Sequence, residues 1–385
     1  MHATVVGINI MAIKDVVSPP PSGLVFGFFL AVMILIFKPL QCLSYGSPPA
    51  MFALGGGLTD VGTNSNLNSS ARGNRPFNGI DCDPPLPTGR LSNCWIVADF
   101  VAKALGFDES PPSFLSVVNS SERFDRAITR QGVSFGSARS GIFNSTGQSA
   151  EPAEAYVTVG QQVDQFGAVV RTRLVALLGR RAADNFLAQS FFLLATGSGD
   201  ILEQRLNAPP GSDLRFLRLF TAQYVDYIRT LYALGGRVFG IVAPPPHGCT
   251  PSFGNSNSSA SECDARANSL SLGVYNSLAS ALRVIRITYP DFQYSICNSV
   301  DLYLDIIANA PSFPACGLTE VRAACCGNGT TTCAPTSTLC GNRDEYLFWN
   351  QYLPTSEGSR LHAAACFGRN PRYWTPISFA ALVKG

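Results

Sequence analysis

The chain has 385 residues, of which 46% are hydrophobic and 14% are charged, and its formal net charge is +2. A hydrophobic fraction of this size is enough for a large core, and together with the low charge it excludes a chain that is disordered throughout. The near-neutral balance also argues against a nucleic-acid-binding protein, which needs a basic surface to neutralise phosphates.

The most apolar segment lies near the amino terminus. Residues 23–37, GLVFGFFLAVMILIF, hold no charge and are followed by Lys38 and Pro39. This segment is shorter than the ~20 residues that a bilayer-spanning helix needs, and it fits the apolar region of a signal peptide. Residues 1–44 are therefore predicted to be a cleaved signal peptide, with an uncleaved amino-terminal anchor as the alternative.

Two further features favour the secretory route, and so a secreted, extracellular or endomembrane protein. Nine of the twelve cysteines lie at or after Cys249, which indicates disulfides formed in an oxidising compartment. Their spacing leaves the pairing open, and the eleven cysteines after Cys42 leave one thiol unpaired. Candidate glycosylation sites of the form Asn-x-Ser/Thr occur at Asn68, Asn119, Asn144, Asn257 and Asn328.

Short apolar runs alternate with amphipathic stretches along the rest of the chain. The runs predict strands at 51–55, 132–136, 190–197, 237–244 and 292–297, the second being the weakest signal. Apolar residues that recur every three or four positions predict helices at 95–107, 161–178, 214–231 and 265–287.

Strands separated by helices of this length predict an α/β fold with one doubly wound, mainly parallel sheet sandwiched between helices. No linker divides the body, so residues 50–385 are expected to form a single domain. In such a sheet the functional residues lie in the loops that follow the carboxyl ends of the strands. The turns after Leu54, Phe135, Ala195 and Val242 are therefore the places where a site is expected.

Seven sequence blocks at these turns and near the carboxyl terminus occur in a fixed order: FALGGGLTDVGTN (52–64), PLPTGRLSNCWIVADFVAKALGF (85–107), GVSFGSARSGI (132–142), FFLLATGSGD (191–200), LYALGGRVFGIVAPPPHGCTP (231–251), ACCGNG (324–329) and NRDEYLFWNQYLPTS (342–356). Together they resemble the plant-type GDSL esterase/lipase family of the SGNH hydrolase superfamily. The first block stands where that family has F-x-F-G-D-S-L-x-D-x-G-N-N, and the third is similar to its G-V-N-F-A-S-G-G-A-G-I. The resemblance implies a flavodoxin-like SGNH hydrolase fold and an origin in plant lipid metabolism.

The chain departs from the family's pattern where the resemblance places the chemistry. The family uses a serine nucleophile, a histidine base with an aspartate partner, and oxyanion donors that include a glycine and an asparagine. The matching residues here are Gly57 for the serine, Leu353 for the histidine, Asn350 for the aspartate, Ala138 for the glycine and Gly199 for the asparagine. The backbone N–H of Ala138 is expected to remain available as an oxyanion donor, whereas the asparagine side-chain donor is lost. The resemblance therefore implies a member without intact catalytic residues.

Other residues offer no replacement chemistry. His247 and His362 are interpreted as surface or loop histidines. Asp60 is interpreted as a residue that caps the helix following the first strand and hydrogen-bonds the loop, rather than as one half of a carboxylate pair with Asp200. Arg139 is interpreted as a solvated side chain, and the sharper hypothesis is that it binds an anionic group. No cofactor or metal site is expected, because the histidines are few and the acids lack ligand spacing.

The leading hypothesis is a secreted pseudoenzyme of the esterase/lipase type. It is expected to lack ester hydrolase activity and to act as a monomer that binds an acyl-ester or glycan ligand or a protein partner. The alternative is an active carboxylic-ester hydrolase with a rearranged site. A family copy that keeps its fold without a retained role is the third hypothesis.

Overall fold

The computed structural model describes residues 47–147, 155–254, 263–310, 317–330 and 333–384, all of which belong to one compact unit, Tyr45–Gly385. The strands are β1 (Met51–Gly55), β2 (Phe191–Ala195), β3 (Val238–Val242), β4 (Gln293–Cys297), β5 (Glu320–Ala324), β6 (Tyr346–Phe348) and β7 (Trp374–Thr375). The α-helices are α2 (Val97–Ala104), α3 (Phe114–Val117), α4 (Ser121–Arg130), α5 (Val159–Gln165), α6 (Thr172–Leu178), α7 (Arg180–Gln189), α8 (Ser198–Asn207), α9 (Asp213–Ala233), α10 (Pro251–Gly254), α11 (Ala265–Thr288), α12 (Ser299–Asn309), α13 (Ser356–Phe367) and α14 (Phe379–Leu382).

Shorter turns of helix connect these elements: η1 (Asn64–Asn66), the π-helical η2 (Phe166–Arg171), η3 (Pro210–Ser212), η4 (His247–Cys249), η6 (Arg343–Glu345) and η7 (Pro371–Tyr373). No described helix is both long and apolar enough to cross a bilayer. The predicted leader, residues 1–44, lies outside the described residues.

The main sheet confirms the predicted fold class. Its strand order is β1-β2-β3-β4-β7, with parallel pairing from β1 to β4 and antiparallel pairing of β7. All five residues of β2 are buried, as expected for a continuous apolar run in a sheet covered on both faces. A second, two-stranded parallel sheet pairs β5 with β6.

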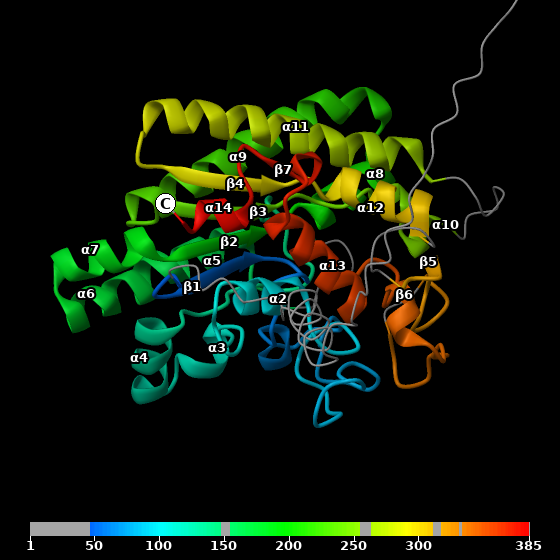
Figure 1. Cartoon of the computed structure of the whole chain (residues 1–385), viewed down its shortest axis with the longest axis horizontal. Helices are drawn as coiled ribbons and strands as arrows, with labels where there is room; N and C mark the ends of the chain where they lie inside the picture. Colours follow the sequence, from blue (N-terminus) through cyan, green and yellow to red (C-terminus); the bar gives the residue numbers. More distant parts are fainter. Residues whose placement is uncertain (1–46, 148–154, 255–262, 311–316, 331–332, 385) are drawn as a thin grey trace, which may run out of the picture. The chain divides into compact units, whose positions relative to one another are not determined.

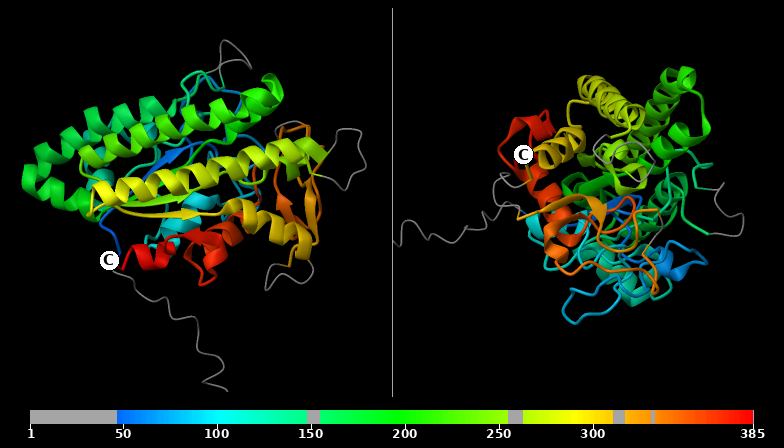
Figure 2. Two further views of the ribbon diagram at one scale, coloured as in Figure 1. Left: turned by 90° about the horizontal axis from the view of Figure 1, so that it is seen from above. Right: turned by 90° about the vertical axis from the view of Figure 1, so that its right-hand side faces the viewer.

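Helices cover both faces of the main sheet (Figure 1). On one face, alternate strand residues such as Phe52, Phe192 and Phe239 pack with apolar side chains of α5, η2, α9 and α11. On the other face, Met51, Phe191 and their neighbours pack with α2, α13 and α14. In Figure 2 the long helices α9 and α11, coloured green and yellow, lie side by side along the sheet.

The weakest predicted strand, 132–136, is not a regular strand. Its backbone runs parallel to β1 and exchanges hydrogen bonds with it, because Ala53 N–H donates to the Val133 carbonyl and Phe135 N–H donates to the Ala53 carbonyl. Only isolated bridges form, at Ser134. Two glycines in five residues and the sharp turn that follows shorten the pairing.

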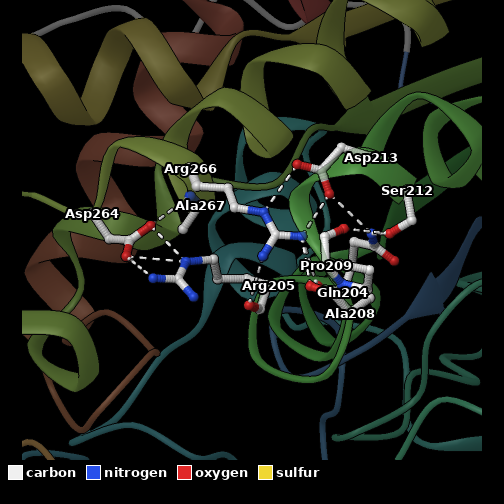
Figure 3. Close-up of polar contacts among 9 residues, drawn as sticks. All are labelled: Gln204, Arg205, Ala208, Pro209, Ser212, Asp213, Asp264, Arg266 and Ala267. Atoms are coloured by element: carbon white, nitrogen blue, oxygen red, sulfur yellow. Dashed lines mark hydrogen bonds and ion pairs between the residues drawn. The ribbon is translucent and has the colours of Figure 1, made fainter.

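Two ion pairs join the ends of the helices α8, α9 and α11 (Figure 3). Arg205, near the end of α8, binds Asp264, which caps the start of α11 by accepting from Ala267 N–H. Arg266 binds Asp213 at the start of α9 with an N–O distance of 2.7 Å. These pairs tie α8, α9 and α11 together, and α8 begins at the carboxyl end of β2.

The late cysteines form disulfides, as predicted. The five pairs among the described residues are Cys82–Cys94, Cys249–Cys263, Cys297–Cys366, Cys325–Cys340 and Cys326–Cys333. These pairs use ten of the eleven cysteines after Cys42, and the eleventh, Cys316, lies outside the described residues.

Candidate functional site

A cavity of about 330 Å³ opens at the carboxyl ends of β1, β2 and β3. This is the edge of the sheet at which the sequence predicts a site. The five positions that the resemblance assigns to catalysis all line this cavity, and so does Arg139: they are Gly57, Ala138, Gly199, Asn350 and Leu353. The rest of the lining is mainly glycine, alanine, leucine and proline, with the polar residues Ser140, Thr146, Thr196, Ser198, Glu203, Gln351 and Tyr352.

Gly57 and Leu353 face each other. A Cβ atom built on Gly57 would lie 3.1 Å from both terminal methyl carbons of Leu353. A side chain at position 57 would therefore meet the side chain at position 353, which is the relation that a nucleophile and its base require. Glycine has no nucleophilic atom and leucine accepts no proton, so this pair cannot begin acyl transfer.

Asn350 uses its side chain to close its own turn. Its Oδ1 accepts hydrogen bonds from the backbone N–H groups of Tyr352, at 3.0 Å, and Leu353, at 2.9 Å. The side chain is buried. It therefore fixes the position of Leu353 but has no imidazole to orient.

Gly199 lies in the first turn of α8 and adds no donor to the cavity beyond its backbone. A Cβ atom at this position would lie 3.0 Å from the Cγ2 methyl of Thr146. A larger residue at 199 would press on Thr146, so the cavity wall has closed around the glycine. Removing a single oxyanion donor from a hydrolase typically costs ~10²–10³ in rate.

Asp60 holds the loops on either side of the cavity. Its carboxylate accepts from the N–H groups of Gly62, Thr63 and Ala138, at 3.0, 2.7 and 2.9 Å. Burial raises the pKa of Asp60 to about 6. The expectation that Ala138 N–H is available as an oxyanion donor is wrong, because this N–H is engaged by Asp60. The interpretation of Asp60 as a loop-bonding residue is confirmed.

Asp200 likewise fixes a loop by accepting hydrogen bonds, in its case the loop of residues 142–146. It is buried and accepts from the N–H groups of Ile142 and Phe143 and from the hydroxyl of Thr146, at 2.9, 3.1 and 2.6 Å. Burial raises its pKa as well. Neither Asp60 nor Asp200 is among the described residues that line the cavity, so they are not a carboxylate pair for catalysis.

Gln162 is a structural residue that the sequence analysis missed. Its Oε1 accepts from Gly55 N–H at 2.7 Å, and its Nε2 donates to the Gly55 carbonyl at 3.0 Å and to the Val157 carbonyl at 2.9 Å. The side chain is fully buried. Gln162 thus anchors the last residue of β1, immediately before the loop that carries Gly57.

Comparisons with known proteins now identify the fold. The family model GDSL-like Lipase/Acylhydrolase matches residues 51–366. The chain belongs to this family. GDSL esterase/lipase At3g53100 of Arabidopsis thaliana is 30% identical to it over 358 residues, which cover 88% of this chain and 95% of that protein. GDSL esterase/lipase 7 of the same plant is 31% identical over 356 residues, which cover 87% and 92%.

Arg139 stands out among the cavity residues of this GDSL chain by its backbone. Its φ is 75°, and it is the only non-glycine residue with a positive φ in the described part of the chain. This left-handed conformation favours glycine. The family motif given above has two consecutive glycines, at the positions of Ala138 and Arg139, and the second glycine is the signal that predicts such a turn.

The two histidines correct an expectation, because neither is on the surface. His247 is 2% exposed and His362 is 0% exposed. Burial lowers the pKa of His247 to about 4 and that of His362 to about 3. The His362 ring contacts the hydroxyls of Ser299, at 2.7 Å, and Tyr303, at 3.3 Å. Neither histidine lines the cavity, so no imidazole reaches the GDSL site among the described residues.

One group of potential metal ligands lies between the end of β4 and α13. Cys297, His362 and Cys366 bring their ligand atoms within 4.8 Å of one another. The two cysteines are joined in a disulfide, so neither offers a thiolate to a metal. The group is best described as a buried disulfide packed against a neutral histidine.

The sequon asparagines are accessible where they are described. Asn68, Asn119, Asn144 and Asn328 are exposed, and Asn257 lies outside the described residues. Exposure is necessary for glycosylation, which stays a prediction.

Proposed function

We propose that this GDSL-family protein binds a ligand with an apolar acyl or ester group and does not hydrolyse it. The family is consistent with an esterase/lipase, but function depends on the site rather than on the fold. The observation that carries the proposal is the contact between position 57 and Leu353, where methyl groups stand beside a glycine.

The cavity supports a ligand of this kind. Its volume of about 330 Å³ lies at the lower end of the range for small-molecule sites, ~300–1,000 Å³. Leu58, Leu91 and Leu353 give it apolar walls, and the buried Thr196 hydroxyl, which has no hydrogen-bond partner among the described residues, offers a polar contact. Arg139 adds a positive charge at the rim, suited to a carboxylate or phosphate on the ligand.

Secretion or residence in the endomembrane system is part of the proposal. It is supported by five disulfides among the described residues, by the apolar leader and by the sequons. Expression of the full chain in a eukaryotic secretory host, followed by endoglycosidase treatment, tests it. A glycosylated product in the medium supports the proposal, and an unglycosylated intracellular product contradicts it.

The absence of hydrolysis is tested on the purified protein with a fluorophosphonate probe and with short- and long-chain p-nitrophenyl esters. We expect no labelling and no turnover above a heat-inactivated sample. Labelling or turnover would instead support a rearranged hydrolase. Such a site would depend on the hydroxyl-bearing and carboxylate residues that line the cavity, which are Ser140, Thr146, Thr196, Ser198, Tyr352 and Glu203.

Ligand binding is tested separately with a fluorescent long-chain acyl probe. Gly56 lines the cavity, and a Cβ atom there has only the Ser140 carbonyl oxygen within 4 Å, at 3.6 Å. Gly56→Leu should therefore fill the cavity and weaken probe binding at least about tenfold, a loss of ~1.4 kcal/mol. Gly211→Leu is the matched control, since a Cβ atom at Gly211 has no neighbour within 4 Å. Equal binding by both variants would contradict an acyl site in this cavity.

A further inference from the structure

A second cavity lies outside the candidate site and is lined by α4 and the loop that precedes α3. Both helices are labelled in Figure 1. We call this cavity the α4 groove and define it by Arg123, Arg126 and Arg130 of α4 with Ser110, Ser113 and Glu109. Its volume is about 730 Å³. The cavity of the candidate site that holds Gly57 and Leu353 is called the GDSL cavity below. The α4 groove shares no described lining residue with it, so the proposed function does not account for the groove.

The arginines of the groove form one basic stripe. Arg123, Arg126 and Arg130 are spaced by three and four residues, so they lie on one face of the helix, and all three are exposed. Arg123 and Arg130 are seven residues apart along the helix, a length of ~10 Å at 1.5 Å per residue. The opposite face of α4 packs into the core through Phe124 and Ile128.

Most of this positive charge is not neutralised by the protein. The two acids of α4 are already engaged, Asp125 with Arg173 at 2.7 Å and Glu122 with Arg126 at 2.6 Å. Within the described residues, neither Arg123 nor Arg130 takes part in an ion pair. Glu109 is the one acidic residue in the described lining and leaves a net positive groove.

A buried hydroxyl in the groove lacks a partner. Ser110 is 8% exposed, and its Oγ makes no hydrogen bond within the described part of the chain. A buried hydroxyl without a partner is unfavourable, because it has lost its hydrogen bonds to water, so a ligand that supplies the missing hydrogen bond is favoured. The carbonyl of the same residue is held by the Gln131 side chain at 3.1 Å, which fixes the loop at the groove wall.

We propose that the α4 groove binds an acidic oligosaccharide whose carboxylates meet Arg123 and Arg130 and whose hydroxyls meet Ser110 and Ser113. Guanidinium groups match carboxylates with paired hydrogen bonds, and a stripe ~10 Å long suits a chain with repeated charges better than a single ion. The serines and a lining that exposes more polar than apolar surface suit sugar hydroxyls. No described lining residue is aromatic, which disfavours single-stranded nucleic acid, because that ligand needs stacking platforms.

The test measures binding of a purified oligogalacturonate to the full-length protein by calorimetry, with its methyl-esterified form as the neutral comparison. The double variant Arg123→Gln/Arg130→Gln should weaken binding of the acidic oligomer at least about tenfold, consistent with the loss of charge-assisted hydrogen bonds. Arg283→Gln/Arg286→Gln on α11 is the matched control, because both residues are exposed and the charge change is the same. Ser110→Ala should weaken binding about threefold without lowering the melting temperature.

The proposal is supported if the groove variant alone loses affinity and the methyl ester binds at least about tenfold more weakly than the acid. Equal losses in the groove and control variants would show attraction to overall charge and overturn it. Inorganic phosphate that competes at the same concentration as the oligomer would show a single-anion site and also overturn it. So would binding only to a phosphopeptide or to anionic vesicles. None of these results bears on hydrolysis or on the acyl probe.

Discussion

Two groups of residues surround the GDSL cavity, and they differ in how fully their polar atoms are used. The outer group consists of Asp60, Asp200 and Gln162, which are buried and make several hydrogen bonds each to the loops that form the cavity. The central group consists of Gly57 and Leu353, which bring only hydrogen and methyl groups to the place where the resemblance puts a nucleophile and a base.

The residues that a stable fold requires are therefore different from those that catalysis requires. A buried carboxylate or amide that fixes several backbone N–H groups is needed for stability whether or not the site reacts. A nucleophile and a base are needed only for turnover. The outer group therefore explains why the chain keeps the cavity of its family, and the central group supports the proposal that it binds without hydrolysis.

The largest expected effect comes from replacing the central group together with Gly199 and Asn350. The combined variant Gly57→Ser/Gly199→Asn/Asn350→Asp/Leu353→His should hydrolyse a short p-nitrophenyl ester at least ~10³-fold faster than the native protein, since an intact triad contributes up to ~10⁶. The contact of position 57 with position 353 supplies the geometric basis. Initial rates and fluorophosphonate labelling are the measurements.

Gly57→Ser alone is the matched control for that experiment. Its new side chain would meet the Leu353 methyls rather than a proton acceptor, so no increase in rate is expected. If the combined variant folds, as shown by an unchanged circular dichroism spectrum, and still has no activity, the assignment of these positions is wrong.

Breaking the outer group should reduce stability rather than activity. Asp60→Ala leaves the N–H groups of Gly62, Thr63 and Ala138 without their acceptor and should lower the free energy of unfolding by ~3–5 kcal/mol. Chemical denaturation measures the change. Gly57→Ala, which changes the central group, should cost less than ~1 kcal/mol, since the crowded atoms belong to the flexible end of Leu353. Equal losses would contradict the separation of the two groups.

The sequence predicted the sheet better than it predicted this polar arrangement. Continuous apolar runs such as 191–195 identify buried strands, because a strand covered on both faces is apolar at every position instead of alternating between apolar and polar residues. The partners of Asp200 and Gln162 lie 58 and 107 residues away in the chain, and local patterns carry no record of such contacts. The burial of His247 was missed for the same reason, since one histidine in a proline-rich loop has no periodicity.

The buried His247 should make the stability of the protein depend on pH, independently of the outer and central groups. The folded-state pKa of His247 is about 4, below the ordinary value of 6.5, so the unfolded chain binds more protons in this range and stability falls as pH falls from 6.5 towards 4. Between pH 7.5 and pH 5 this residue should account for a loss of ~2 kcal/mol. His247→Leu should therefore lose less unfolding free energy on acidification than the native protein. An identical pH dependence in both would contradict a neutral buried His247.

The smallest expected effect concerns the turn at the rim of the cavity. Arg139 has a φ of 75°, a conformation that costs a residue with a side chain ~1 kcal/mol relative to glycine. Arg139→Gly should thus raise the free energy of unfolding by ~1 kcal/mol and shift thermal unfolding upward by a few degrees. Arg139→Ala is the control, because it removes the charge but keeps the Cβ atom and the strain. If alanine stabilises the protein as much as glycine does, the arginine side chain rather than the backbone is the source of the effect.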